Sequence, residues 1–192
     1  GLAAKIDNPL EVDYSEIPNF PVSTVEGHEG KLIYGDFGGK KVVAMKGRFH
    51  YYEGYGPEDV VLPIRVLKYL GIRHLFLSNA AGGVNPLFQI GDIMIITDHI
   101  NLMPNPLTGK NDDRIGPRFP DMSEAYDRGL IEKALLIAGK NGIRIRTGIY
   151  LVTTLPNFER PGRYKYFRIN GADSVGMSTA LEVIVERQMG VP

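Results

Sequence analysis

Hydrophobic residues recur along this chain with two different periods. Apolar runs at residues 31–37 and 41–46, separated by a glycine pair, predict a β-hairpin. Between residues 57 and 71 the apolar positions instead recur every three or four residues, which predicts a helix opened by a proline. The first 20 residues show neither period and are interpreted as a peripheral lead-in.

The two periods continue to alternate toward the C-terminus. Strands are predicted at 74–78, 92–97, 143–153 and 174–175, and helices at 123–142, 161–169 and 181–189. Residues 101–120, rich in Pro, Asn, Asp and Gly, predict a long loop, which in a compact domain is usually functional or mobile. Strands that alternate with helices after an opening hairpin predict an α/β fold. In it, a single domain over residues 1–192 contains a mixed β-sheet flanked by helices.

Composition narrows the classes of partner. The chain has 22 basic and 22 acidic residues, so no overall field favours nucleic acid or membrane, and an anionic ligand must be held by local groups. The absence of cysteine excludes disulfides and thiolate metal sites and agrees with a cytoplasmic location. No apolar run reaches the roughly 18–20 residues of a membrane span, and no signal peptide is visible. We therefore expect no nucleic-acid or membrane partner.

The segment at residues 47–55 carries the densest candidate chemistry. If it is extended, Arg48, His50 and Tyr52 project to one side, because side chains of a strand alternate. A permanent cation beside a titratable imidazole suits a bound phosphate, and Glu53 is close enough in sequence to orient His50. The alternative is a strand end with a surface arginine and a solvated histidine.

Two segments of small residues are further candidates for anion binding. Residues 78–83 follow a predicted strand, where small side chains let backbone amides approach a ligand, although an ordinary turn fits the same pattern. Ser178 and Thr179 precede a predicted helix whose N-terminus favours an anion, and Met177 offers a soft apolar surface to a sugar. Simple capping of that helix by a hydroxyl is the alternative.

The tripeptide Asn157-Phe158-Glu159 indicates a site for a base. The Phe158 ring is suited to stacking on it. A carboxylate only accepts hydrogen bonds, so Glu159 suits the N1–H and exocyclic amine of a 6-oxopurine and disfavours N1 of adenine. Alternatively, Phe158 belongs to a small core and Glu159 opens a helix. His28, between glycines, either closes over a phosphate or is a solvated loop residue, and no spacing of His, Asp and Glu suggests a metal.

Together, these segments resemble the trimeric, low-molecular-mass purine nucleoside phosphorylases. The matching blocks, in the same order, are residues 14–20, 22–27, 47–55, 78–85, 91–101, 118–127 and 171–179. Several blocks in one order are far more specific than any single motif. The resemblance implies the nucleoside phosphorylase fold and phosphorolysis. A purine nucleoside (inosine, guanosine or a deoxy form) and phosphate would give the free base and (deoxy)ribose 1-phosphate.

The resemblance also implies roles for individual residues. Phosphate is bound by Arg48, His50, the backbone of Ala80 and Ser178, with His28 closing over it. The ribose is contacted by Tyr52 and Met177 and by Phe119 of a neighbouring subunit. The purine is lined by Ala81, Gly82, Phe158, Glu159 and Val175. His50 and Glu159 are the expected catalytic residues. The family implies a cytoplasmic homotrimer without cofactor or metal, in which phosphate is a co-substrate. The glycosidic bond breaks ahead of phosphate attack, so positioning and electrostatics act on an oxocarbenium-like sugar.

Departures from the family pattern leave three functions open. The family's glycine-rich phosphate loop lies upstream of Gly1 and its base-reading asparagine beyond Pro192, so we expect a domain that is incomplete at both ends. Leu155 replaces a glycine, and Arg160, which replaces a threonine, is expected to divert Glu159 from the base. The alternatives are an active 6-oxopurine nucleoside phosphorylase, a catalytically silent fragment or homologue that folds and oligomerises, and a methylthioadenosine phosphorylase, which the carboxylate disfavours.

Overall fold

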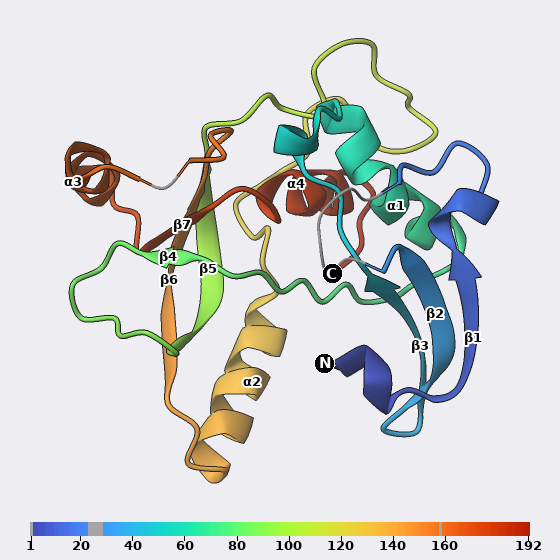
Figure 1. Ribbon diagram of the computed structural model, residues 1–192, viewed down its shortest axis with the longest axis horizontal. Coiled ribbons are helices and arrows are strands. Elements are labelled where there is room, and N and C mark those ends of the chain that lie inside the picture. The colour runs from blue at the N-terminus through green and yellow to red at the C-terminus, as the bar shows by residue number, and fades with distance from the viewer. Residues whose placement is uncertain (1, 23–28, 158) are drawn as a thin grey trace.

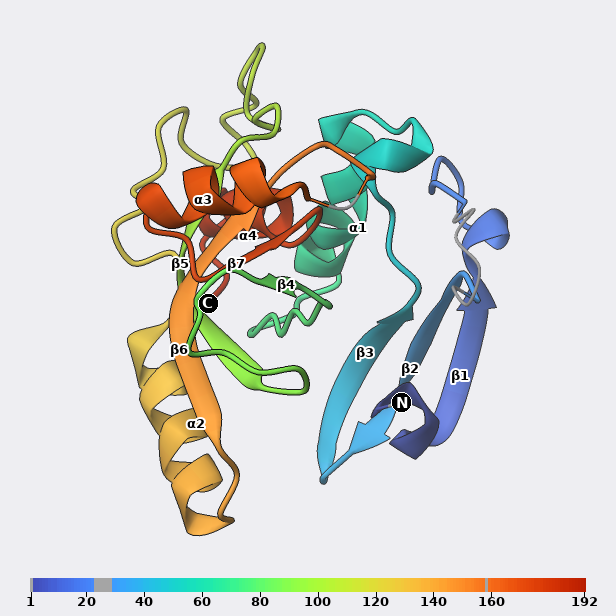
Figure 2. The ribbon, with the colours of Figure 1, turned by 60° about the vertical axis from the view of Figure 1, so that its left-hand side comes forward.

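Two β-sheets lie on opposite sides of the molecule, with helices α1 (Pro57–Tyr69) and α4 (Ala180–Gln188) between them (Figures 1 and 2). The computed structural model of the chain describes residues 2–22, 29–157 and 159–192. Single-turn 3₁₀ helices at Leu2–Lys5, Tyr14–Glu16 and Tyr51–Glu53 supplement these elements. The predicted α/β class is confirmed, and its strands divide between two sheets.

The first sheet is antiparallel and contains β1 (Asp7–Asp13), β2 (Lys31–Phe37) and β3 (Lys40–Lys46), in that order. The predicted hairpin is β2–β3. Its two turn residues, Gly38 and Gly39, both have positive φ (56° and 74°), as the tight two-residue turn of a hairpin requires. Strand β1 falls in the segment interpreted as a lead-in. All seven of its residues are exposed, so it carries no hydrophobic period by which to detect it.

The second sheet is mixed and has the order β4-β7-β6-β5. Its strands are β4 (Gly82–Gly83), β5 (Ile93–Asn101), β6 (Ile145–Val152) and β7 (Ser174–Gly176). The pairs β5–β6 and β6–β7 are parallel, and β4 runs antiparallel to β7. Parallel neighbours need a crossover connection, and helices α2 (Arg128–Lys140) and α3 (Pro161–Ile169) supply the two required here.

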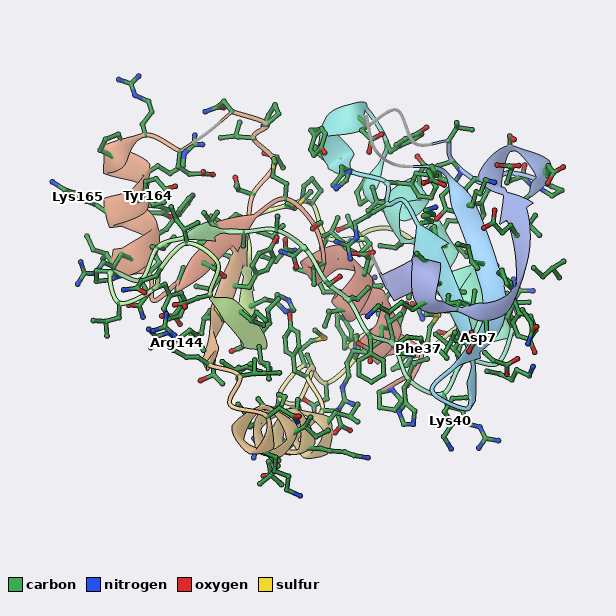
Figure 3. All side chains as sticks on the ribbon, turned by 60° about the horizontal axis from the view of Figure 1, so that its bottom comes forward. Asp7, Phe37, Lys40, Arg144, Tyr164 and Lys165 are labelled. Carbon is green, nitrogen blue, oxygen red and sulfur yellow. The ribbon has the colours of Figure 1, made fainter. Side chains whose placement is uncertain are left out.

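The main hydrophobic core joins both sheets through α1 and α4. Val61 and Ile64 of α1 and Leu181 of α4 are almost completely buried together with Val152 of β6. Partly buried side chains of β3 pack against the same cluster. Figure 3 shows the resulting arrangement. The first sheet, with Asp7, Phe37 and Lys40, lies at one end of the molecule, and Tyr164 and Lys165 of α3 lie at the other. Because α4 is central, whatever its first turn binds is supported by the core.

Two predicted elements differ in the structure. Residues 74–78 form no strand, because no described strand pairs with them; the Leu75 N–H instead donates to the Pro192 carbonyl at 2.9 Å. Helix α2 begins at Arg128 and not near Ser123. Its N-cap is Asp127, whose carboxylate accepts the Leu130 N–H at 2.7 Å. A nearer capping residue therefore displaces the predicted start of this helix.

Glu186, in the middle of α4, makes a pH-dependent contribution to stability. Burial raises the pKa of its carboxyl from 4.5 to about 8, an effect that the charge of Arg187 opposes. The unfolded chain ionises first as pH rises from 4.5 to 8, so the folded state loses stability in that window. We expect the free energy of unfolding of Glu186→Gln to exceed that of the wild type by about 3–5 kcal/mol at pH 9 and to be almost equal to it at pH 4. Urea denaturation of both proteins at the two pH values measures these free energies. The same difference between variant and wild type at pH 4 and at pH 9 would contradict the expectation.

Candidate active site

The start of α4 brings together two of the predicted phosphate ligands. Arg48 follows β3, and Ser178 lies between β7 and α4, where Figure 1 shows the chain entering the centre of the molecule. The Arg48 Nη1 donates to Ser178 Oγ at 3.2 Å and to the Ser78 carbonyl at 3.0 Å. Residues that lie 130 positions apart thus form one cationic and hydroxylic site.

The segment that contains Ala80 is held against the same turn. Thr179 Oγ1 donates to Asn79 Oδ1 at 2.8 Å, and Asn79 Nδ2 donates to the Ala80 carbonyl at 3.0 Å. The Ser78 carbonyl contacts Arg48. The predicted phosphate-binding backbone of Ala80 is therefore next in sequence to a residue that is hydrogen bonded to the start of α4.

His50 is oriented by Glu53, as the sequence predicted. His50 Nδ1 lies 2.9 Å from Glu53 Oε1, and the same oxygen accepts the His50 N–H at 2.8 Å. Since a carboxylate only accepts hydrogen bonds, Nδ1 carries the hydrogen in this pair. The predicted extended geometry is wrong beyond His50, because residues Tyr51–Glu53 form a 3₁₀ turn. Tyr52 consequently stacks on His50, with ring centroids 4.7 Å apart.

The backbone at Thr179 is strained. Its φ of 71° and ψ of −54°, together with a 2.8 Å hydrogen bond from the Ala180 N–H to the Ser178 carbonyl, define a γ-turn. A β-branched residue rarely adopts a positive φ, and such conformations persist only where the surroundings hold them. The turn sets the position of Ser178 relative to Arg48.

Two buried residues of this site were not predicted from the sequence. Glu182 Oε1 accepts from Arg48 Nε at 3.2 Å, and Tyr150 Oη accepts from the Ser178 N–H at 3.3 Å. Burial raises the pKa of the Tyr150 hydroxyl above its ordinary value. A Thr-x-x-Glu capping pattern from Thr179 to Glu182 was available as a signal for the first residue. For the second residue, inside strand β6, the sequence offers none.

The predicted purine-lining residues are only partly assembled. Gly82 pairs with Val175 in the β4–β7 ladder, and a Cβ at Gly82 would lie 3.4 Å from the Tyr164 hydroxyl, so α3 packs close to this strand pair. Glu159 is partly exposed, and no ion pair joins it to Arg160 in the part of the chain that the structure describes. The proposed contributions of His28 and Phe158 lie outside the described residues.

A glycine next to the turn is required by close packing. A Cβ on Gly176 would lie 2.2 Å from the hydroxyl of Tyr150, which is fully buried and has no room to move. We expect Gly176→Ala to lower the free energy of unfolding by about 1–3 kcal/mol. Gly139→Ala on α2 is the control, since only its chain neighbours and the backbone of its own helix lie within 4 Å of its Cβ position, and we expect it to be neutral or slightly stabilising. Urea denaturation of both variants tests the difference, and equal stability would contradict it.

Phe119 lies apart from this cluster, on the loop that follows β5, and its side chain is 87% exposed. It borders a pocket of about 710 Å³ whose lining includes Asp98, His99, Asn101, Arg118 and Met122. His99 Nδ1 lies 2.9 Å from the Tyr126 hydroxyl, and burial lowers the pKa of the imidazole. The structure therefore does not bring Phe119 into the arginine site of its own chain.

The described residues form neither a membrane span nor a metal-binding cluster. Within residues 2–22, 29–157 and 159–192, no helix has the length and apolarity needed to cross a membrane. In the same ranges no group of three or more His, Asp and Glu side chains is arranged to hold a metal ion.

Comparisons of the sequence and of the structure with known proteins agree on one family. A family model described as the phosphorylase superfamily matches residues 1–192. Purine nucleoside phosphorylase 1 of Geobacillus stearothermophilus is 53% identical over 191 residues, which cover 99% of this chain and 70% of that protein. The Rattus norvegicus purine nucleoside phosphorylase is 49% identical over 197 residues, with 100% and 68% covered. The Schistosoma mansoni enzyme in complex with inosine superposes with a TM-score of 0.95 at 44% identity, over 99% of this chain and 69% of that one.

Proposed function

Since the chain belongs to the phosphorylase superfamily and, within it, to the purine nucleoside phosphorylases, we infer that it catalyses the phosphorolysis of purine nucleosides. Inosine, guanosine and their deoxy forms react with phosphate to give the free base and (deoxy)ribose 1-phosphate. The observation that carries this function is the bond between Arg48 and the Ser178 hydroxyl at the start of α4. It unites a fixed positive charge, a hydroxyl donor and the positive end of a helix dipole.

Phosphate is the co-substrate bound at this position. Arg48 and Ser178 donate to its oxygens, and the backbone of Ala80 and the Nε2 of His50 complete the set, with His28 closing over it. The bound dianion lies beneath the sugar ring. As the glycosidic bond lengthens, it stabilises the positive charge that develops on the ribose and then bonds to the anomeric carbon. Neither a covalent enzyme intermediate nor a cofactor is required.

Ribose and purine occupy the region between His50 and strand β4. Tyr52 and Met177 face the ribose. Ala81, Gly82, Val175 and Phe158 line the purine, and Glu159 accepts the N1–H and exocyclic amine of a 6-oxopurine. Because a carboxylate disfavours N1 of adenine, the presence of Glu159 supports inosine and guanosine over methylthioadenosine as substrates.

Phosphate-dependent cleavage of inosine tests the function directly. The purified chain is incubated with inosine, with and without phosphate, and hypoxanthine and ribose 1-phosphate are quantified. We expect product only when phosphate is present, and slower turnover of methylthioadenosine. Absence of turnover with either nucleoside would support the catalytically silent alternative, and preferential cleavage of methylthioadenosine would support the sister activity.

A cytoplasmic homotrimer is the proposed functional state. The exposed Phe119 supports it, because an aromatic side chain left 87% exposed beside a pocket is suited to insertion into a neighbouring subunit, here beside its ribose. The absence of cysteine fits a reducing compartment. Light scattering on the purified protein measures the mass, and a monomer that cleaves inosine at full rate would contradict the trimer.

A further inference from the structure

Glu182 is a buried carboxylate that contacts both the arginine and the strained turn of the phosphate site. Its Oε1 accepts from Arg48 Nε at 3.2 Å, its Oε2 accepts from the Thr179 N–H at 2.9 Å, and its side chain is 4% exposed. We propose that Glu182 is a positioning residue, which holds the Arg48 guanidinium and the turn bearing Ser178 in the arrangement that receives phosphate. The inference rests on the proposed phosphate site.

The contact with Arg48 sets the plane of the guanidinium. A guanidinium is flat, so fixing two of its nitrogens fixes the directions of the remaining N–H bonds. Glu182 holds Nε, and Nη1 points at Ser178 Oγ and at the Ser78 carbonyl. The carboxylate therefore determines which edge of the arginine is presented at the start of α4.

The contact with Thr179 supports the strained backbone. Glu182 Oε2 accepts the N–H of the residue whose φ is positive, and the Thr179 hydroxyl in turn donates to Asn79. One carboxylate thereby links the segment after β3, the segment that contains Ala80 and the first turn of α4. Strain of this kind is retained only where neighbouring contacts hold it, and these contacts supply that support.

The charge of Glu182 distinguishes positioning from simple attraction. A negative charge next to the arginine weakens the electrostatic attraction of the site for phosphate. If net charge alone determined binding, removing the Glu182 charge would improve the affinity for phosphate. If Glu182 acts by positioning, the same change weakens the affinity, so the two explanations predict opposite signs.

Glu182→Gln is the decisive variant. Both carboxylate oxygens accept N–H bonds, whereas the isosteric amide has one acceptor and must turn its NH₂ toward Arg48 Nε or the Thr179 N–H. We expect the KM for phosphate and the calorimetric Kd for inorganic phosphate to rise about tenfold to a hundredfold, with the KM for inosine changed far less. Glu186→Gln is the control for a buried glutamate-to-glutamine change, since Glu186 lies one turn along α4 and no side-chain bond joins it to Arg48 or Thr179 among the described residues, and we expect an unchanged KM for phosphate.

A double-mutant cycle with Arg48→Lys tests whether Glu182 acts through the arginine. In the Arg48→Lys background we expect Glu182→Gln to change the KM for phosphate less than about twofold, because the guanidinium that Glu182 orients is absent. A full effect in that background, or an unchanged or lower KM for phosphate in the single variant, would overturn the proposal. If Glu182→Gln fails to fold by circular dichroism, Glu182→Asp, which keeps the charge but is one methylene shorter, is measured in its place with the same expectation. If the wild type does not cleave inosine, the proposed function fails, and phosphate calorimetry still decides the role of Glu182.

Discussion

Arg48→Met is expected to lower kcat/KM for phosphate by about 10²–10³, while the KM for inosine changes far less. Methionine keeps much of the length of the side chain and removes the charge and all of its donors. The Nη1 bond to Ser178 is lost, and the phosphate dianion loses the cation that stabilises it as the ribose becomes positive. Steady-state kinetics at varied phosphate and saturating inosine measure the effect.

Two controls separate this effect from general damage. Arg168→Met removes an exposed cation in the last turn of α3 that is not among the residues assigned to the site, and we expect kcat/KM to be unchanged. Arg48→Met also leaves Glu182 buried without its cationic partner, which we expect to cost about 3–5 kcal/mol of stability. Kinetics are therefore measured well below the melting temperature. A folded Arg48→Met variant with wild-type dependence on phosphate would refute the site.

The second large effect is expected at Glu159. Glu159→Gln should lower kcat/KM for inosine by about 10²–10³, because the carboxylate proposed to accept the purine N1–H is replaced by an amide that presents one acceptor. An amide also donates, so it tolerates N1 of adenine, and the ratio of adenosine to inosine cleavage should rise. Both rates are measured with the same enzyme preparation.

A glutamate remote from the base provides the comparison. Glu132 is exposed on α2, and we expect Glu132→Gln to leave both cleavage rates and their ratio unchanged. Undiminished inosine cleavage by Glu159→Gln, or an unchanged ratio, would show that Glu159 does not contact the base. Within the described residues no ion pair joins Glu159 to Arg160, so Arg160 does not divert this carboxylate from a base.

The elements that could be predicted are those with a buried face. Helix α1 and the β2–β3 hairpin follow directly from hydrophobic periods and turn glycines. Strand β1 has no buried face and left no pattern to detect. Residues 74–78 have an apolar pattern typical of a strand, but a strand also needs a partner, and none of the described strands supplies one. Pairing is a property of the whole fold that a local pattern does not contain.

The same distinction applies to the site. Arg48, His50 and Ser178 lie in short segments whose residue types already suggest anion binding, and the structure joins two of them by a hydrogen bond. Glu182 acts across 134 positions of sequence, so its contact with the arginine follows only from the fold. Strand alternation predicts that Tyr52 projects to the same side as Arg48 and His50, but the 3₁₀ turn that begins at Tyr51 instead stacks Tyr52 on His50.

The position of α4 makes ligand binding and folding a linked equilibrium. Almost all of its residues are buried, several of them in the main core, while its first turn carries the proposed phosphate site. Any opening of the core that releases α4 must also release a phosphate held there, so the ion opposes unfolding by mass action. At a concentration 100 times its Kd, this linkage amounts to about 2.7 kcal/mol. The melting temperature of the protein should consequently report how fully its site is occupied, without any measurement of turnover.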